Sequence, residues 1–86
     1  MKELEKQLKA LANRRRLAIL KLLKSNRRFA VGDIADAIKL SFKATSKHLG
    51  VLYAAGMVEK EQVSASVLYR LSENLPIGIS HIVSIL

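Results

Sequence analysis

The sequence predicts a mainly α-helical domain with a small β-hairpin, in the order of four helices, two strands and one final helix. Apolar residues recur at helical spacing through the chain as far as Gly56. After that glycine the spacing changes to the alternation of a strand pair, and Pro76 opens a last apolar segment. Because the chain has 86 residues, we expect one domain, residues 1–86, with a small core.

Four helices precede the hairpin. Leu4, Leu8 and Leu11 lie at helical spacing in the first, at residues 1–12. Asn13 is a residue type that caps helices, so a second helix is expected from residue 14 to 24. The remaining two are expected at 31–39 and, after a cap at Ser41, at 42–54.

The helix at 42–54 has two different faces. At about 100° per residue, Thr45, Leu49, Leu52 and Tyr53 fall on an apolar face, and His48 lies at its edge. The opposite face is small and basic, and its members are Lys43, Ser46, Lys47, Gly50 and Ala54. Such a face offers hydrogen-bond donors, positive charge and close approach, so the DNA major groove is its leading partner.

A hairpin is predicted after this helix, with strands at 57–63 and 66–71. Ser64 and Ala65 join the strands, and neither favours the positive φ of a two-residue turn, so we expect a longer, mobile tip. Two short helices joined by a tight turn and followed by a hairpin form a winged helix-turn-helix. In such a unit the second helix enters the major groove of double-stranded DNA.

Positive charge is concentrated in the first half of the chain, whose overall net charge is +8. Residues 1–47 hold thirteen Lys and Arg against four Asp and Glu, a balance of +9, and residues 48–86 hold two against three, a balance of −1. Such a field attracts polyanions, with nucleic acid first among them. Charge alone leaves open a basic surface with no specific partner.

Other classes of function find little support in the composition. The chain has no cysteine, and His48 and His81 are its only histidines, so we expect no enzyme activity, no cofactor and no metal site. Lysines and glutamates recur through the first ten residues, unlike a signal peptide. The longest apolar run, residues 75–86, is shorter than the roughly 20 residues of a spanning helix. We therefore expect a cytoplasmic protein that does not enter a membrane.

Several segments carry a family pattern, namely Leu8-Lys-Ala-Leu-Ala-Asn-Arg-Arg-Arg-Leu-Ala-Ile-Leu20, Ser46-Lys-His-Leu-Gly-Val-Leu52, Ala55-Gly-Met-Val58 and Tyr69-Arg-Leu71. On these residues the chain resembles the ArsR/SmtB family of small winged-helix repressors, over about residues 4–72. The resemblance implies a homodimer that represses transcription and is often released by a metal or another inducer. It places the dimer interface in the terminal helices, about 1–12 and 76–86. The predicted interface residues are Leu4, Leu8, Ile79, Ile82, Val83 and Leu86.

The metal sites that the resemblance implies do not carry over. Ala30 and Gly32 stand where the family has cysteines, and Ile79 replaces the aspartate of a second site, although His81 matches its histidine. We infer no metal sensing, and the inducer stays unknown. The wing also departs from the family pattern, because residues 62–66 are neutral where Arg and Gly are common.

The predicted DNA contacts are Phe42, Lys43, Ser46, Lys47, His48, Arg14 and Arg15. Phe42 fits contact with a thymine methyl and packing on the third helix equally well, and His48 fits packing or a phosphate bond. Cations in the first turn of a helix oppose its dipole, so the three arginines predict a compensating anion. For Arg16 this is an internal salt bridge, and for Arg14 and Arg15 a carboxylate and a DNA phosphate fit equally well.

Together these residues predict a sequence-specific DNA-binding transcriptional regulator, a repressor that binds a palindromic operator as a homodimer. The alternative is a winged-helix protein-interaction module that does not read DNA. The neutral wing favours that alternative, and the basic first half of the chain opposes it.

Overall fold

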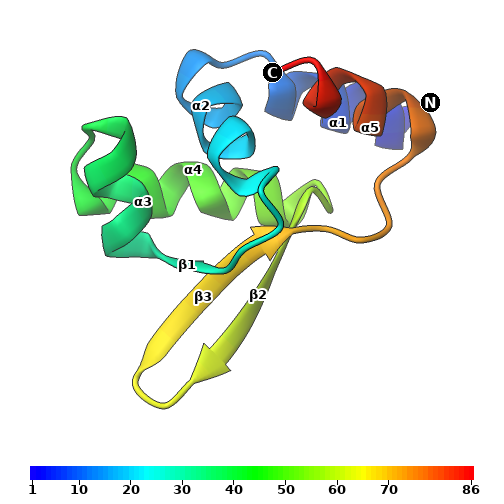
Figure 1. The fold of residues 1–86 in the computed structure, drawn as a ribbon. Helices are drawn as coiled ribbons and strands as arrows, with labels where there is room; N and C mark the ends of the chain where they lie inside the picture. Colours follow the sequence, from blue (N-terminus) through cyan, green and yellow to red (C-terminus); the bar gives the residue numbers. More distant parts are fainter.

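Five helices and three short strands make up the fold of this protein (Figure 1), which a computed structural model describes over residues 1–86. In chain order they are α1 Lys2–Leu11, α2 Arg14–Leu23, β1 Phe29–Ala30, α3 Val31–Ile38, α4 Phe42–Ala54, β2 Val58–Val63, β3 Ser66–Leu71 and α5 Ile77–Ser84. The predicted order of helices and strands is confirmed, with β1 added. None of the helices has the length and apolar character needed to cross a membrane.

Side-chain caps place the starts of α2 and α4 where the sequence predicted them. The Asn13 side chain accepts hydrogen bonds from the backbone N–H groups of Arg15 and Arg16, at 2.9 and 3.1 Å. Ser41 Oγ accepts from the backbone N–H of Ala44 at 3.1 Å. Lys39 ends α3 in the left-handed conformation, with φ of 57°, so the turn between α3 and α4 is tight.

The hairpin is part of a three-stranded antiparallel sheet in the order β1-β3-β2. The strand β1, which the sequence did not predict, pairs Phe29 with Tyr69 and Ala30 with Leu68. Two residues are too few for a strand pattern to be visible, since strand periodicity needs several alternating positions. This pairing joins the segment before α3 to the base of the wing.

The expected longer hairpin tip is wrong. Val63 pairs directly with Ser66, so Ser64 and Ala65 form a two-residue turn. Ser64 takes a positive φ of 54° without being glycine or asparagine, and its carbonyl accepts a hydrogen bond from the Gln62 side chain at 3.0 Å. The cross-strand pairing of the six-residue strands holds the turn in this conformation.

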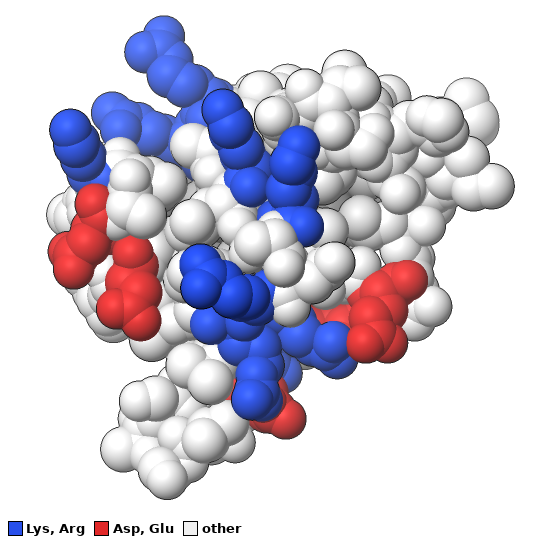
Figure 2. All heavy atoms as spheres, in the orientation of Figure 1, with Lys and Arg blue, Asp and Glu red and all other residues white.

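Surface charge divides the molecule as the sequence predicted. Lys and Arg side chains gather over α2 and the connection that follows it, whereas the tip of the hairpin carries no charge (Figure 2). Two arginines form ion pairs at the sheet: Arg28, just before β1, pairs with Glu61, and Arg70 of β3 pairs with Glu59 and Glu73. Most of the positive charge without an ion pair therefore lies on the helices and on the connection after α2.

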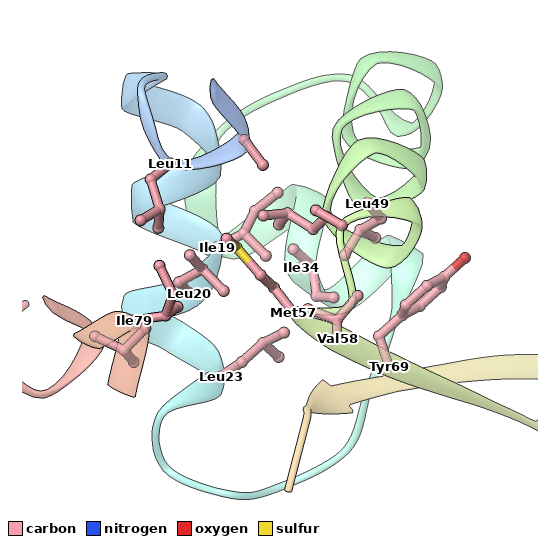
Figure 3. Packing of buried hydrophobic residues seen from close by; sticks show 14 residues of the cluster. Leu11, Ile19, Leu20, Leu23, Ile34, Leu49, Met57, Val58, Tyr69 and Ile79 are labelled. Carbon is pink, nitrogen blue, oxygen red and sulfur yellow. The ribbon is translucent and has the colours of Figure 1, made fainter. Parts of the chain in front are cut away.

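The core joins all layers of the molecule in one cluster of 14 buried residues (Figure 3). Ile19 and Leu20 of α2 point toward Ile34 of α3, Leu49 of α4 and Met57 at the start of the wing. All five are 0–1% exposed. The buried face of α4 therefore packs against α2, and the opposite face of α4 is exposed.

The structure revises two of the predicted interface residues. Ile79 and Val83 of α5 are 2% and 3% exposed and belong to the core of the single chain, so they present almost no surface to a second copy. Leu4 and Leu8 of α1 are 44% and 48% exposed. An apolar helix face shows in the sequence, but whether the chain's own core covers it depends on tertiary packing.

Thr45 leads to a prediction about stability. Its side chain is fully buried in the core face of α4, and its hydroxyl has no hydrogen-bond partner. Replacing an unpartnered buried hydroxyl with a methyl group removes a desolvation penalty, so Thr45→Val should raise the free energy of unfolding by about 1 kcal/mol. Urea denaturation measures the change. Thr45→Ser, which keeps the hydroxyl and loses the methyl, should be less stable than the wild type, and a destabilised Thr45→Val would contradict the assignment.

Candidate nucleic-acid interface

The outer face of α4 is a basic, low-relief surface. Lys43, Ser46, Lys47, Gly50 and Ala54 are all exposed, as the helical spacing predicted. Thr45, Leu49 and Leu52 on the other side are fully buried and fix the rotation of the helix about its axis. Neither lysine on the outer face forms an ion pair, so both ammonium groups are free to meet an external partner.

Packing inside the chain does not require a glycine at position 50. A Cβ added there would meet no atom within 4 Å. Glycine in a helix interior destabilises the helix by about 1 kcal/mol relative to alanine. At Gly50 no packing contact inside the chain offsets this loss. A smooth surface that lets another molecule approach the helix backbone accounts for this residue.

Phe42 stands at the start of α4, 62% exposed. With Ser46 it lines a groove of about 390 Å³, whose walls include Val31 at the start of α3 and Ala65 and Val67 of the wing. Of the two roles left open by the sequence, the exposure favours contact with an external apolar group, since most of the ring is not covered by α3.

Arg16 connects α1, α2 and α4. Its Nε donates to the carbonyl oxygen of Ala10 at 2.6 Å, and its Nη2 donates to that of Lys9 at 3.0 Å. Its Nη1 lies 3.4 Å from Nδ1 of His48 on α4. The predicted internal salt bridge of Arg16 is therefore wrong, because its partners are the carbonyls at the end of α1 and a neutral ring nitrogen. Those carbonyls lack helical partners of their own and attract a cation.

His48 is neutral at neutral pH in this setting. Burial first, and then the positive charges of Arg16, Arg15 and Lys47, lower the pKa of the imidazole below its ordinary value. Arginine only donates, so Nδ1 accepts from Arg16 and the ring proton resides on Nε2. The half-buried ring thus has a single N–H donor besides its bond to Arg16.

Arg14 and Arg15 lie in the first turn of α2, exposed and without an ion pair. The first turn contains no acidic residue that would offset them. The charge of Arg15 contributes to lowering the pKa of His48.

Tyr53 differs from its predicted position. It is 46% exposed, and the ammonium group of Lys60 lies 4.3 Å from the centre of its ring. The helical angle placed Tyr53 with the apolar face, but its neighbour Leu52 is the residue that enters the core and Tyr53 lies outside it. Lys60, which the sequence did not single out, is a further cation beside α4.

Metal ligands are not gathered anywhere in the chain, since no group of three or more His, Asp and Glu side chains is placed to hold an ion. Ala30 and Gly32, at the positions of the family's cysteines, line the groove beside Phe42.

Comparison with known families shows which family has this sequence pattern. Residues 13–60 match the sequence profile described as "Bacterial regulatory protein, arsR family". This segment is more than half of the chain and contains α2, α3 and α4 complete. The chain belongs to the arsR family. The resemblance that the sequence indicated is thereby confirmed.

Relatives of this arsR-family chain include both an activator and a repressor. It is similar to the transcriptional activator HlyU from Vibrio cholerae serotype O1, with 42% identity over 65 residues, which are 76% of this chain and 59% of HlyU. It is similar to the HTH-type transcriptional repressor SmtB from Mycobacterium tuberculosis, with 38% identity over 76 residues, which are 88% of this chain and 53% of SmtB. The chain spans a little over half the length of these relatives.

Solved structures agree with the predicted fold class. HlyU from Vibrio cholerae is similar with a TM-score of 0.82 and 31% identity, over 96% of this chain and 86% of that one. A homodimeric winged helix-turn-helix DNA-binding domain from Mycobacterium bovis, a possible ArsR-family transcriptional regulator, gives a TM-score of 0.82 and 30% identity, over 98% and 74%. The arsR-family chain therefore has a winged helix-turn-helix fold.

The lowered pKa of His48 predicts a pH dependence of stability. The unfolded chain takes up the proton near the ordinary pKa of about 6.5, and the folded chain takes it up only at lower pH. Between the two values the unfolded state binds more protons, so the free energy of unfolding should fall as pH drops below about 6.5. Urea denaturation at pH 7.5 and at acidic pH measures the fall. His48→Gln keeps an acceptor for Arg16 and leaves His81 in place, so an equal fall in this variant would refute the role of His48.

Gly50 gives a prediction that separates stability from recognition. Gly50→Ala should raise the free energy of unfolding by about 1 kcal/mol, because the helix gains a better former and no neighbour is disturbed. Thermal and urea denaturation check this gain. Gly50→Glu, matched in position but bulky and negative, should fold and lose affinity for duplex DNA. Unchanged DNA affinity in Gly50→Glu would show that the outer face of α4 is not a contact surface.

Proposed function

We propose that this chain is a sequence-specific DNA-binding transcriptional repressor that binds a palindromic operator as a homodimer through α4. The observation that carries the proposal is the outer face of α4, where Lys43 and Lys47 are exposed and unpaired beside the side-chain-free Gly50. The fold holds this face outward, as recognition by a helix-turn-helix requires.

The dimensions and chemistry of α4 suit the DNA major groove. An α-helix with side chains is about 10–12 Å across, and the major groove of B-DNA is about 12 Å wide. Lys43, Ser46 and Lys47 offer donors to base acceptors such as the O6 and N7 atoms of guanine. Phe42 offers an exposed ring to a thymine methyl group.

Side chains suited to contact the DNA phosphate backbone lie around this face of α4. Arg14 and Arg15 are free cations, and the Nε2–H of His48 is a neutral donor held in orientation by Arg16. Contacts to phosphate set the register of a protein on DNA without reading sequence. The neutral tip of the wing adds no charge to this set, which separates the chain from the usual pattern of its family.

The terminal helices support a homodimer. Leu4, Leu8, Met1 and Ala12 line an apolar groove of about 370 Å³ on α1. At the two ends of α5, Ile77 and the C-cap Ile85 are 80% and 82% exposed. Apolar groups exposed in this way mark an interface more often than a free surface. The proposed interface keeps Leu4, Leu8, Ile82 and Leu86 of the predicted set and gains Ile77 and Ile85.

A protein-interaction module that does not read DNA is the second candidate, and the neutral wing tip is the observation in its favour. Two measurements separate the two functions. The module predicts no binding to any duplex at low salt, together with a protein that co-purifies with the chain.

The outer-face lysines give the sharpest test of DNA reading. Lys43→Ala/Lys47→Ala should weaken binding to a selected duplex at least about tenfold and lower the salt dependence of binding, because two cationic donors are lost. Fluorescence anisotropy across a salt series measures both effects. Lys2→Ala/Lys6→Ala on α1 removes the same charge from another surface and should bind within about threefold of the wild type. If both variants lost the same affinity for the duplex, DNA binding would depend on net charge alone and not on the outer face of α4.

The operator itself is predicted to be symmetric. Selection of bound fragments from random DNA should recover palindromic sites with half-sites about 10 bp apart or a multiple of that distance, since two copies of α4 read the two halves. Sedimentation of the selected complex should give two chains per duplex. Recovery of non-symmetric sites with one chain per duplex would remove the homodimer from the proposal.

A further inference from the structure

A second charged surface lies on α2; it shares Arg14 and Arg15 with the phosphate contacts proposed above and extends from them along α2, away from the outer face of α4. It is an open groove of about 550 Å³ between α2, the connection that follows it and α3. Its lining runs from Arg14 at the start of α2 to Ser25 just beyond the end, which is about 16 Å at 1.5 Å per residue. Three turns of another helix have the same length.

The rim of this groove is positive at both ends. Arg14 and Arg15 lie at one end, and Lys21 and Arg27 lie toward the other. None of the four forms an ion pair, and no carboxylate lines the groove. Arg28 and Arg70 are paired with glutamates, whereas the groove cations, like Lys43 and Lys47 of α4, have no carboxylate partner within the chain.

The four cations are unfavourable in the isolated chain. Arg14 and Arg15 oppose the dipole of α2 and have no acidic neighbour in its first turn. Lys21 and Arg27 extend the same positive field along the groove. An external anion would relieve this repulsion at both ends.

The floor of the groove is apolar, and this separates it from a surface for phosphate alone. Ala18 and Leu22 of α2 face Ala37 and Ile38 of α3 across it. A DNA backbone offers charge but no apolar group to cover these side chains. An amphipathic helix with acidic flanks offers both.

We propose that this groove binds an acidic amphipathic helix of a protein partner, with apolar side chains on the floor and Asp or Glu side chains at the two ends. Charge complementarity to four unpaired cations and the length of the groove carry the assignment. The partner helix is expected to have apolar residues at i, i+3 or i+4 and i+7, because that spacing forms one helix face. The inference does not depend on DNA binding by α4.

The test uses a labelled synthetic peptide with a leucine face and glutamates at both ends, capped at its termini, and fluorescence anisotropy at low salt. A second peptide carries serine in place of leucine and keeps every glutamate. The wild-type chain should bind the leucine peptide about tenfold more tightly than the serine peptide, since only the first covers the floor. Equal binding of the two peptides would overturn the proposal in favour of charge attraction alone.

Two pairs of charge reversals locate the site. Lys21→Glu/Arg27→Glu alters the groove, and Lys2→Glu/Lys6→Glu makes the same change in charge on α1, outside it. Only the groove variant should lose about tenfold or more in affinity for the leucine peptide. Equal losses in both variants would overturn the site. Ala37→Gln fills the exposed floor of the groove without changing its charge. This variant should bind the leucine peptide more weakly than the wild type does and should bind the serine peptide with the same affinity.

Duplex binding distinguishes the groove from the proposed DNA surface. Lys21→Glu/Arg27→Glu should bind a selected duplex as well as Lys2→Glu/Lys6→Glu does. Loss of duplex affinity in the groove variant alone, with no peptide bound by the wild type, would make the groove a DNA backbone contact and overturn the proposal. Peptide binding with no duplex binding by any variant would refute the DNA function and leave the groove assignment standing.

Discussion

The rest of the structure depends on the packing of α2 against α4. The contact is made by fully buried residues of one cluster, namely Ile19, Leu20 and Leu23 of α2 and Leu49 and Leu52 of α4. It sets the rotation of α4 about its own axis. Close packing tolerates little change in volume or position, so the lysine face of α4 has a defined direction rather than a range of directions. Recognition of DNA by a helix needs that definition, because base contacts are specific only in a fixed geometry.

Polar contacts extend this arrangement to α1. Arg16 holds two carbonyls at the end of α1 and faces His48 on α4, so one guanidinium group ties together a terminal helix and the proposed recognition helix. A displacement of α1, such as one at a dimer interface, would therefore reach α4 through a short path of hydrogen bonds. The neutral state of His48 keeps that path free of a second positive charge.

Eight of the fifteen Lys and Arg residues fall into three groups with different surroundings. Arg28 and Arg70 form ion pairs within the protein, Lys43 and Lys47 of α4 are free on a smooth surface, and the cations of the α2 groove surround an apolar floor without an ion pair. The first group joins β2 to neighbouring segments, the second suits bases and phosphates, and the third suits acidic and apolar side chains together, although its Arg14 and Arg15 are also proposed to contact DNA phosphate. Net charge alone would assign all of them to DNA.

Features that depend on neighbouring residues in the chain were predictable from the sequence. Asn13 and Ser41 cap helices through local hydrogen bonds, and the period of α4 separates its core face from its lysine face. Features that depend on distant residues were not. The pairing of Phe29 with Tyr69, the burial of Ile79 and the carbonyl partners of Arg16 each require a contact between segments far apart in sequence or between separate helices. The small basic face of α4 was therefore visible in the residues alone, whereas its direction, its tie to α1 and the groove beside it came from the packing of the whole chain.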